Sequence, residues 1–454
     1  MPLPKALEYI SSQREDYLTI LFRLVRQPSI SSQRIGVEEC ALLLRDIMEE
    51  QGIRTEIIPT AGLPIVYGEV RTDPALPTIL FYGHYDVQPP EPLELWDSPP
   101  FEPTIRGGRI FGRGVADNKG QLLAHVLAAG AFLKTSGQLP VNAKFLFEGE
   151  EESSSLHLAA FVQENRERLA ADVVYTSDGP MHDSGRPLVF FGARGLLYVE
   201  LTATGAKHDL HSGNKGGIAP NPAWELVNLL STMRDRDGNV TIDGFYDDVR
   251  PPTNYERQLL AALPLDEEEI KRDLGISQLP GPGDISFYER LMFRPTLNIA
   301  GFASGYGGAG SKTIIPARGV VKMDMRLVAD QDPDDIYEKF VRHVKRQAPG
   351  IEVRRLGRTP PSKTSPELPV SRLVVAAVGE ARGETPVVAP TLGGTLPDYV
   401  FTKILGLPSV GVPYANPDER NHAPNENLVL ENFYAGIRTS AFALERMQAL
   451  ALRS

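Results

Sequence analysis

Cysteine is almost absent from this sequence: Cys40 is the single cysteine among 454 residues. An internal disulfide is therefore excluded, which argues against a disulfide-stapled scaffold and favours a reducing, cytoplasmic location. The surrounding stretch, GVEECALLLRDIMEEQG, has helical periodicity. We therefore expect Cys40 to pack in a core rather than to react.

Long apolar runs and a secretory signal are also missing. No stretch is long enough to cross a bilayer. The N-terminus, MPLPKALEYI, lacks the basic segment, apolar stretch and small-residue cleavage site of a signal peptide. We therefore expect no membrane partner.

An excess of positive charge is absent as well. The chain has 47 Lys and Arg against 58 Asp and Glu, with a net charge of −11. This balance argues against binding nucleic acid through a general basic surface. Ordinary apolar (42%) and charged (23%) fractions instead indicate a folded globular protein, and the length favours two domains.

Strand and helix signals alternate in the first part of the chain. Helical periodicity covers residues 15–27, 37–50, 119–136 and 156–170, and strand patterns cover 64–70, 77–83, 143–149 and 172–179. Such alternation predicts an α/β fold whose mostly parallel sheet is covered by helices.

The pattern changes after about residue 195. Strand-like alternation at 196–205 and 319–330 is separated by long segments rich in Pro, Gly and acidic residues, and 358–369 has a linker composition. The first pattern then returns. We predict a catalytic domain formed by residues 1–194 and 361–454, interrupted by a smaller α+β domain at 195–360. Trp96 and Trp224 are expected to pack rather than to bind a ligand.

Acidic and His residues follow the predicted strands. His84 and Asp86 follow one strand, Glu150 to Glu152 follow the next, and Asp178 follows a third. Asp117 precedes a helix, and His422 lies in a loop after a late strand. Because ligands of open parallel sheets bind beyond the carboxyl ends of the strands, we expect these side chains to converge.

Each of these residues also has a simpler interpretation. Asp117 has the position of a helix N-cap, the three glutamates could form a solvated acidic turn, and His84 or His422 alone is typical of a hydrogen-bonded histidine. Their convergence favours metal, because carboxylates crowded into one cleft repel each other unless a cation compensates them.

The donor types suggest which metal this would be. Mixed His and carboxylate ligands suit zinc, with manganese or cobalt as alternatives, and no cysteine thiolate is among them. Two His and three carboxylates exceed the needs of one tetrahedral ion and suit two. Asp86 is placed to support the His84 imidazole by a hydrogen bond.

Six segments together resemble a known family: GHYDVQPP, GRGVADNKGQ, FEGEEESSS, TSDG, DLHSG and NHAPNE. In this order they are similar to the motifs of the two-zinc aminoacylase and carboxypeptidase-like metallopeptidases, nearest to the carnosinase-like nonspecific dipeptidases. The resemblance runs from about residue 15 to the C-terminus. It implies a split catalytic domain, an inserted dimerisation or lid domain, and a homodimer.

The resemblance also implies roles for single residues. It assigns the two ions to His84 and Asp178 on one side and Glu152 and His422 on the other, with Asp117 bridging both. Glu151 would be the general base. Glu150 is then expected to be a solvent-facing or structural acid, and Asn118, where the family often has a second acid, to alter the surroundings of the ligands.

Residues of the predicted inserted domain match the substrate contacts of the family. His211 in DLHSG would stabilise the oxyanion from across a dimer, although His208 competes for this role from the sequence alone. Thr313 and Arg326 would grip the substrate, with Arg326 as a clamp on a terminal carboxylate. Gly394 stands where the dipeptidases can carry a serine.

These observations predict a two-metal hydrolase of dipeptides or other short peptides with a free C-terminal carboxylate. Deacylation of N-acyl amino acids is the alternative with the same water chemistry. A catalytically silent binding scaffold is the third reading, and the complete ligand and base set argues against it.

Overall fold

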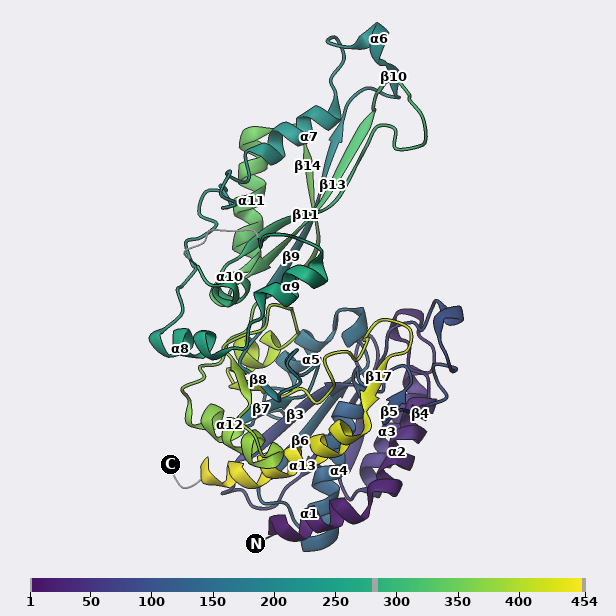
Figure 1. Ribbon diagram of the computed structural model, residues 1–454, viewed down its shortest axis with the longest axis vertical. Coiled ribbons are helices and arrows are strands. Elements are labelled where there is room, and N and C mark those ends of the chain that lie inside the picture. Colours follow the sequence, from purple (N-terminus) through teal and green to yellow (C-terminus); the bar gives the residue numbers. More distant parts are fainter. Residues whose placement is uncertain (1, 280–284, 451–454) are drawn as a thin grey trace.

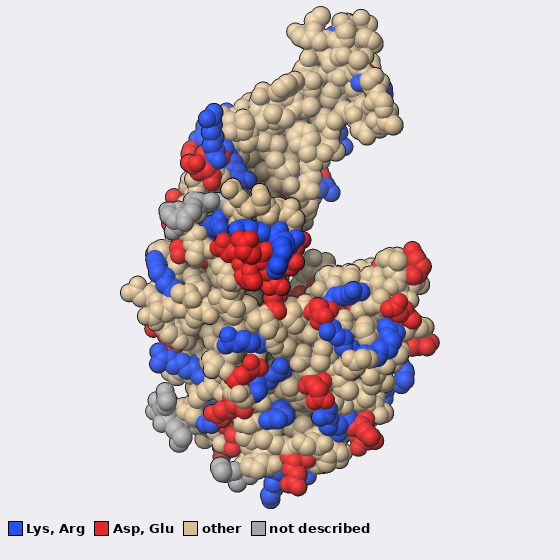
Figure 2. All heavy atoms as spheres, viewed as in Figure 1, with Lys and Arg blue, Asp and Glu red and all other residues tan. Residues whose placement is uncertain are grey.

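The computed structural model describes residues 2–279 and 285–450 of the chain. Its backbone forms two main sheets, an eight-stranded one in the lower part of Figure 1 and a four-stranded one in the upper part. The surface between the two parts is hollowed on one side (Figure 2). Within the described residues, no helix is both long and apolar enough to span a bilayer.

The eight-stranded sheet has a parallel centre. In spatial order its strands are β1 (Arg54–Ile58), β2 (Ile65–Val70), β6 (Asn142–Glu148), β3 (Thr78–His84), β7 (Val173–Thr176), β16 (Ser409–Gly411), β8 (Leu188–Phe190) and β15 (Val387–Ala389). β3 pairs in parallel with β6 and β7, and β16 with β7 and β15 with β8 do the same. The other neighbours are antiparallel. The predicted mostly parallel α/β fold is confirmed.

Helices cover both faces of this sheet. They are α1 (Pro2–Ser12), α2 (Arg14–Arg26), α3 (Val37–Glu50), α4 (Lys119–Ser136), α5 (Leu158–Glu164), α12 (Pro369–Arg382), α13 (Leu430–Met447) and a π-helix, Val400–Leu405. Consecutive strand residues point to opposite faces. Phe81 accordingly packs in the core with α4 and α13, whereas Leu80 packs with α5 and the π-helix.

A small sheet joins the end of the chain to its first third. Its strands are β17 (Asn427–Val429), β5 (Arg109–Phe111) and β4 (Thr104–Arg106). The short 3-10 helices are Ser31–Gln33, Leu93–Leu95, Glu151–Ser153 and Gln448–Leu450. Because β17 pairs with β5, the loop that precedes β17 lies against the loops around residue 110.

The upper part is built on an antiparallel sheet with one covered face. Its strands, in order, are β11 (Thr296–Ser304), β13 (Arg318–Leu327), β9 (Gly195–Thr204) and β14 (Glu352–Thr359). The strict alternation of burial in β9 and β13 buries one face against α7 (Pro222–Ser231) and α11 (Pro333–Gln347). The remaining elements are β10 (Leu210–His211), β12 (Ile314–Ile315), α6 (Ser212–Lys215), α8 (Asn254–Ala262), α9 (Glu267–Leu274) and α10 (Phe287–Phe293).

Two chain segments, one near residue 193 and one near residue 362, connect the lower and upper parts of the molecule, and hydrogen bonds join these segments to each other. The segment with a linker composition is not a loose tether: Ser362 donates its backbone N–H to the Ala193 carbonyl (3.0 Å) and Thr364 donates to Phe191 (2.6 Å). Apolar residues of α8 and α10 also pack against the β8–β15 edge of the large sheet. The two parts are therefore held together by a hydrophobic contact as well as by the two connecting segments.

Cys40 is fully buried in α3, as expected. The helix expected over 156–170 is shorter in the structure, Leu158–Glu164, and Leu169 N–H donating to the Asn165 carbonyl (3.0 Å) forms a separate turn beyond it. Lys144 Nζ donates to the Arg168 and Ala170 carbonyls after that turn begins (2.6 and 2.7 Å). The expectation that Trp224 packs is wrong within this chain, since its side chain is 64% exposed on α7.

His125 offers a test of the core beneath the sheet. It is fully buried in α4 against Phe81, its Nδ1 lies 2.9 Å from Ser440 Oγ, and burial lowers its pKa from 6.5 to about 3. A depressed folded pKa means that unfolded chains take up a proton first as the pH falls below about 6.5, so stability is lost there.

We expect His125→Asn to remove part of this acid sensitivity. Between pH 7 and pH 5.5 the wild-type free energy of unfolding should fall by about 1 kcal/mol more than that of the variant. Urea unfolding at the two pH values measures the difference. Parallel losses in both proteins would contradict the assignment.

Candidate metal centre

Three neighbouring strand ends deliver most of the candidate residues. His84 is the last residue of β3, Glu151 and Glu152 follow β6, and Asp178 follows β7. Because these strands run parallel, their carboxyl ends meet at one edge of the sheet, as expected from the sequence. The loop before α4 brings in Asp117. A loop after β16 brings in His422 with a left-handed backbone (φ 56°).

Asp117 lies between the two histidines. Its Oδ1 is 3.1 Å from His84 Nε2, and its Oδ2 is 3.3 Å from His422 Nε2. Burial opposes the charged carboxylate, but the hydrogen bonds to His422 and His84 outweigh burial and lower its pKa. The N-cap alternative is excluded, because Asn118 occupies the N-cap of α4.

The orientation of His84 is fixed from its other side. Its Nδ1 lies 3.1 Å from the Asp86 carbonyl oxygen, so Nδ1 carries the proton that this bond requires. Nε2 is then the nitrogen left to bind a proton or a metal ion, and it is buried facing Asp117 at 3.1 Å and Asp178 at 3.9 Å. The carboxylates crowded around Nε2 repel one another, so this geometry favours a cation among them.

A second cluster forms around His422. Its Nε2 lies 3.1 Å from Glu152 Oε2, which also accepts a hydrogen bond from Gln88 Nε2 (3.0 Å). Hydrogen bonds to Asp117 and Glu152 raise the pKa of His422 to about 10. The site therefore draws positive charge toward both sides of Asp117.

Asn118 holds Asp178 in place. Its Nδ2 donates to the Ser177 carbonyl (2.6 Å) and to Asp178 Oδ1 (3.2 Å), while Oδ2 of Asp178 is left facing His84. Asn118 therefore donates directly to a ligand candidate, which an ionised acid at this position could not do.

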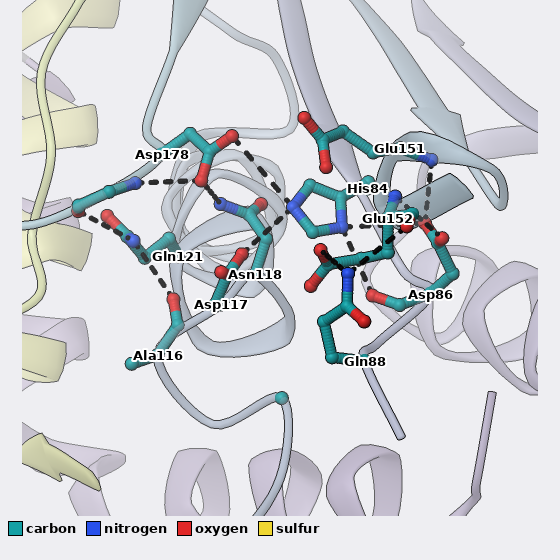
Figure 3. Close-up of polar contacts among 12 residues, drawn as sticks. His84, Asp86, Gln88, Ala116, Asp117, Asn118, Gln121, Glu151, Glu152 and Asp178 are labelled. Carbon is teal, nitrogen blue, oxygen red and sulfur yellow. Dashed lines mark hydrogen bonds and ion pairs between the residues drawn. The ribbon is translucent and has the colours of Figure 1, made fainter. Parts of the chain in front are cut away.

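Asp86 organises the turn that carries the two glutamates. Its carboxylate accepts the backbone N–H groups of Glu151 (3.2 Å) and Glu152 (3.0 Å), as Figure 3 shows. The Glu151 carboxylate itself makes no hydrogen bond to any described residue. Burial raises its pKa well above 4.5, and neighbouring carboxylates add to the shift, although His84 opposes it. A buried carboxylate with a shifted pKa and no hydrogen bond is a candidate for proton transfer.

These contacts fit a divalent cation. The ligand atoms of His84, Asp117 and Glu152 all lie within 4.8 Å of one another. Nitrogen and carboxylate oxygen donors are the set that zinc, manganese and cobalt accept. The orphaned Nε2 of His84 and the two-sided contacts of Asp117 are the features that a bound cation would satisfy.

Glu150 was expected to be either a solvent-facing or a structural acid, and the structure shows the second. It is buried, it accepts a hydrogen bond from the Leu63 backbone (3.1 Å), and its Oε2 lies 2.8 Å from His157 Nδ1. It is therefore not a solvent-facing acid. It anchors the turn of Glu151 and Glu152 to the neighbouring loop.

Sequence reasoning missed three buried residues near the site. Arg113 and Glu426 form an ion pair beneath the Asp117 loop, and Glu419 has both carboxylate oxygens buried without a hydrogen bond among the described residues. Burial raises the pKa of Glu419 to about 9, and Asp117 and other carboxylates add to the shift. The available signal was their position within GRGVAD and NPDERNHAPNE.

The substrate candidates lie in two separate places. Arg326, on β13 near the large sheet, donates from Nη1 to Thr395 Oγ1 (2.7 Å), next to Gly394, whose carbonyl accepts the Arg194 backbone N–H (3.0 Å). His211 and Thr313 are exposed at the far tip of the upper part, where β10 is labelled in Figure 1. One chain therefore does not bring His211 and Thr313 to its own Asp117.

Comparison with known proteins gives a consistent result. The model of peptidase family M20/M25/M40 matches residues 80–446. The chain is 30% identical to human Beta-Ala-His dipeptidase over 94% of this chain and 85% of that protein. It is also 30% identical to the Candida albicans Cys-Gly metallodipeptidase DUG1, over 97% of this chain and 96% of that protein.

A solved structure shows the same fold along nearly the whole chain. The M20 family metallo-carboxypeptidase Sso-CP2 from Sulfolobus solfataricus is 36% identical, with a TM-score of 0.88 over 95% of this chain and 99% of that chain. The resemblance expected from the six motifs is therefore confirmed. The chain belongs to peptidase family M20/M25/M40.

Proposed function

We propose that this protein is a metal-dependent peptidase that hydrolyses dipeptides or other short peptides with a free C-terminal carboxylate. The proposal depends mainly on the position of Asp117, because one of its carboxylate oxygens faces His84 and the other faces His422. The relatives support it, since they are named as dipeptidases, metallodipeptidases and a metallo-carboxypeptidase.

Two divalent ions fit the arrangement. His84 and Asp178 would hold one, Glu152 and His422 the other, and Asp117 would contact both. Zinc is the metal that this mixture of nitrogen and carboxylate donors favours, with manganese or cobalt as alternatives. When bound, such ions lower the pKa of a water molecule and polarise the amide carbonyl.

Glu151 would transfer the proton of the attacking water to the departing amine. Its half-buried carboxylate is free of hydrogen bonds to the described residues, and its raised pKa suits a group that takes a proton from water and returns it to the departing amine. Asp86 keeps Glu151 beside the centre by accepting its backbone N–H. It also supports His84 from the Nδ1 side, so we assign Asp86 a positioning role.

Arg326 would bind the terminal carboxylate of the substrate. Its Nε is 3.9 Å from Asp324, so the guanidinium is only loosely neutralised, and its Nη1 contact is to a neutral hydroxyl. The neighbouring Gly394 leaves open space, since an added Cβ there would meet nothing within 4 Å. A free carboxylate beside this guanidinium would gain charge-assisted hydrogen bonds.

We expect Arg326→Met to raise KM for a free dipeptide by about 10- to 100-fold, because one or two charge-assisted hydrogen bonds are lost. The C-terminally amidated dipeptide should be affected far less. Steady-state kinetics on both substrates measures the difference. Arg318→Met, at the exposed opposite end of β13, is the matched control, and an equal rise in KM for both substrates would contradict the clamp.

We further propose that the protein is a homodimer joined through its upper part. The tip that carries His211 and Thr313 lies far from the large sheet (Figure 1), and few charged side chains appear at this tip in Figure 2. Ile218, Trp224 and Val227 are exposed there by 79%, 64% and 43%. A second copy covering this surface would also allow His211 to complete the centre of the other subunit.

A mixing experiment tests this arrangement. His211→Ala and Glu151→Gln should each be nearly inactive, but exchanged subunits would form mixed dimers in which one of the two sites is intact. We expect activity to recover to about a quarter of the wild-type value after random exchange. No recovery, despite exchange demonstrated by labelled subunits, would contradict a shared site.

The proposal extends to the domain organisation, the location and the partners of the protein. We infer a catalytic domain from residues 1–194 and 361–454 and an inserted domain from 195–360, supported by the two sheets and by crossings near residues 193 and 362. A cytoplasmic location is supported by the free, buried Cys40. The proposed partners are small peptides, with neither nucleic acid nor membrane among them.

The function is tested by elemental analysis of the purified protein together with a substrate panel. We expect two zinc, manganese or cobalt ions per chain and metal-dependent hydrolysis of unblocked dipeptides. Faster hydrolysis of N-acetyl amino acids would replace the peptidase assignment with the deacylase one. Absence of metal-dependent hydrolysis of any amide would favour a binding scaffold.

A further inference from the structure

A fully buried ion pair lies directly beneath the loop of Asp117. Arg113 Nη1 and Glu426 Oε2 are 2.9 Å apart, and their side chains are 1% and 0% exposed. Neither residue has a role in the proposed hydrolytic mechanism. A charge pair removed from water in this way is costly unless hydrogen bonds satisfy its remaining atoms, so the surroundings of Glu426 decide what the pair does.

The Glu426 carboxylate accepts hydrogen bonds from the backbone of the Asp117 loop. Its Oε2 accepts the N–H of Gly114 (2.9 Å), and its Oε1 accepts those of Ala116 (2.9 Å) and Asp117 (3.0 Å). With Arg113, four donors meet one carboxylate. An amide side chain of the same shape has only one acceptor atom, so it cannot satisfy donors on both sides.

Glu426 also belongs to the loop that carries His422. The next residue, Asn427, begins β17, which pairs with β5, and the Glu426 carbonyl accepts the Gly112 N–H (3.1 Å). Asn425 fixes the same loop from its other side by accepting the Asp97 N–H and donating to the Leu95 carbonyl, both at 3.0 Å. Glu426 thus ties together two loops that lie 309 residues apart in sequence.

We infer that Glu426 is a positioning residue of the metal centre, which sets the spacing between Asp117 and His422 and hence the affinity for the ion that these two residues share. The inference rests on the proposed two-ion centre. Glu426 is not itself a ligand candidate. It joins the loop of Asp117, from the first half of the chain, to the loop of His422, near residue 420.

The test is metal binding by Glu426→Gln, measured by competition with a chromophoric chelator and by the visible spectrum of the Co²⁺ form. We expect one of the two ions to bind about 10- to 100-fold more weakly, as for other residues that orient metal ligands. The Co²⁺ bands should shift. Asp398→Asn is the matched control, because Asp398 is buried in the same part of the chain and bonds to Ser409 instead.

A Glu426→Gln protein that unfolds more easily but binds both ions with unchanged affinity and an unchanged Co²⁺ spectrum would overturn the inference. If that variant does not fold, Glu426→Asp replaces it, since it keeps the charge but shortens the reach. It should bind one ion more weakly than wild type, and unchanged binding or failure to fold would assign Glu426 to the fold alone. Wild-type protein that binds fewer than two ions would instead refute the proposed centre itself.

Discussion

Replacing Glu151 by Gln should lower kcat for dipeptide hydrolysis by about 10²- to 10⁴-fold, the usual contribution of a general base. The amide cannot accept the proton, but it has nearly the same shape as the carboxylate. The ligand candidates and the Asp86 contacts to the backbone of this turn should therefore remain. Metal content, measured on the same sample, should stay at the wild-type value.

The neighbouring Glu150→Gln variant is the matched control. Glu150 lies on the same turn and is buried, but its carboxylate is engaged by Leu63 and His157 rather than free. We expect it to lose less than about tenfold in kcat, since it acts only on the position of the turn. Equal losses in the two variants would show that the turn's geometry, and not proton transfer by Glu151, limits the reaction.

Replacing Asp117 by Ala should remove metal as well as activity. Because its two oxygens face both histidines, the change deletes a contact on each side of the centre at once. We expect metal content to fall below one ion per chain and kcat/KM to fall by about 10³-fold or more, corresponding to roughly 4 kcal/mol of lost metal-dependent stabilisation.

Comparison with Asp178→Ala separates bridging from ordinary ligation. Asp178 contacts only the His84 side, where its Oδ2 is 3.9 Å from Nε2. This variant should lose one ion and keep the other. Loss of a single ion in Asp117→Ala, with the second ion bound at wild-type affinity, would contradict a shared role for Asp117.

The positions of these residues were largely predictable because each follows a strand. A run such as PTILFYG predicts a buried strand. Because neighbouring parallel strands end at the same edge of the sheet, His84, Glu152 and Asp178 could be expected to lie close together. The role of Asp117 was not decided by its local sequence. An acid before a helix reads as an N-cap, and only the tertiary structure shows its carboxylate turned toward His84 and His422.

Features that depend on distant contacts could not be predicted from the sequence. The segment NPDERNHAPNE places Glu426 near the site, but it does not reveal the pairing with Arg113, because that pairing requires β17 to lie beside β5. Glu150 sits in a run of three acids that is typical of a solvated turn, yet His157 and a backbone N–H bury it. The exposure of Trp224 likewise reflects the shape of the upper part, which a local pattern does not encode.

The late position of His422 has a consequence for biosynthesis. Domains generally begin to fold while the ribosome is still adding residues. A nascent chain contains His84, Asp117, Glu152 and Asp178 well before the ribosome reaches His422, which comes 244 residues after Asp178 (422 − 178). Under the proposed two-ion centre, hydrolysis has to await His422, so products that stop before this residue would lack part of the ligand set and leave the peptides around them intact.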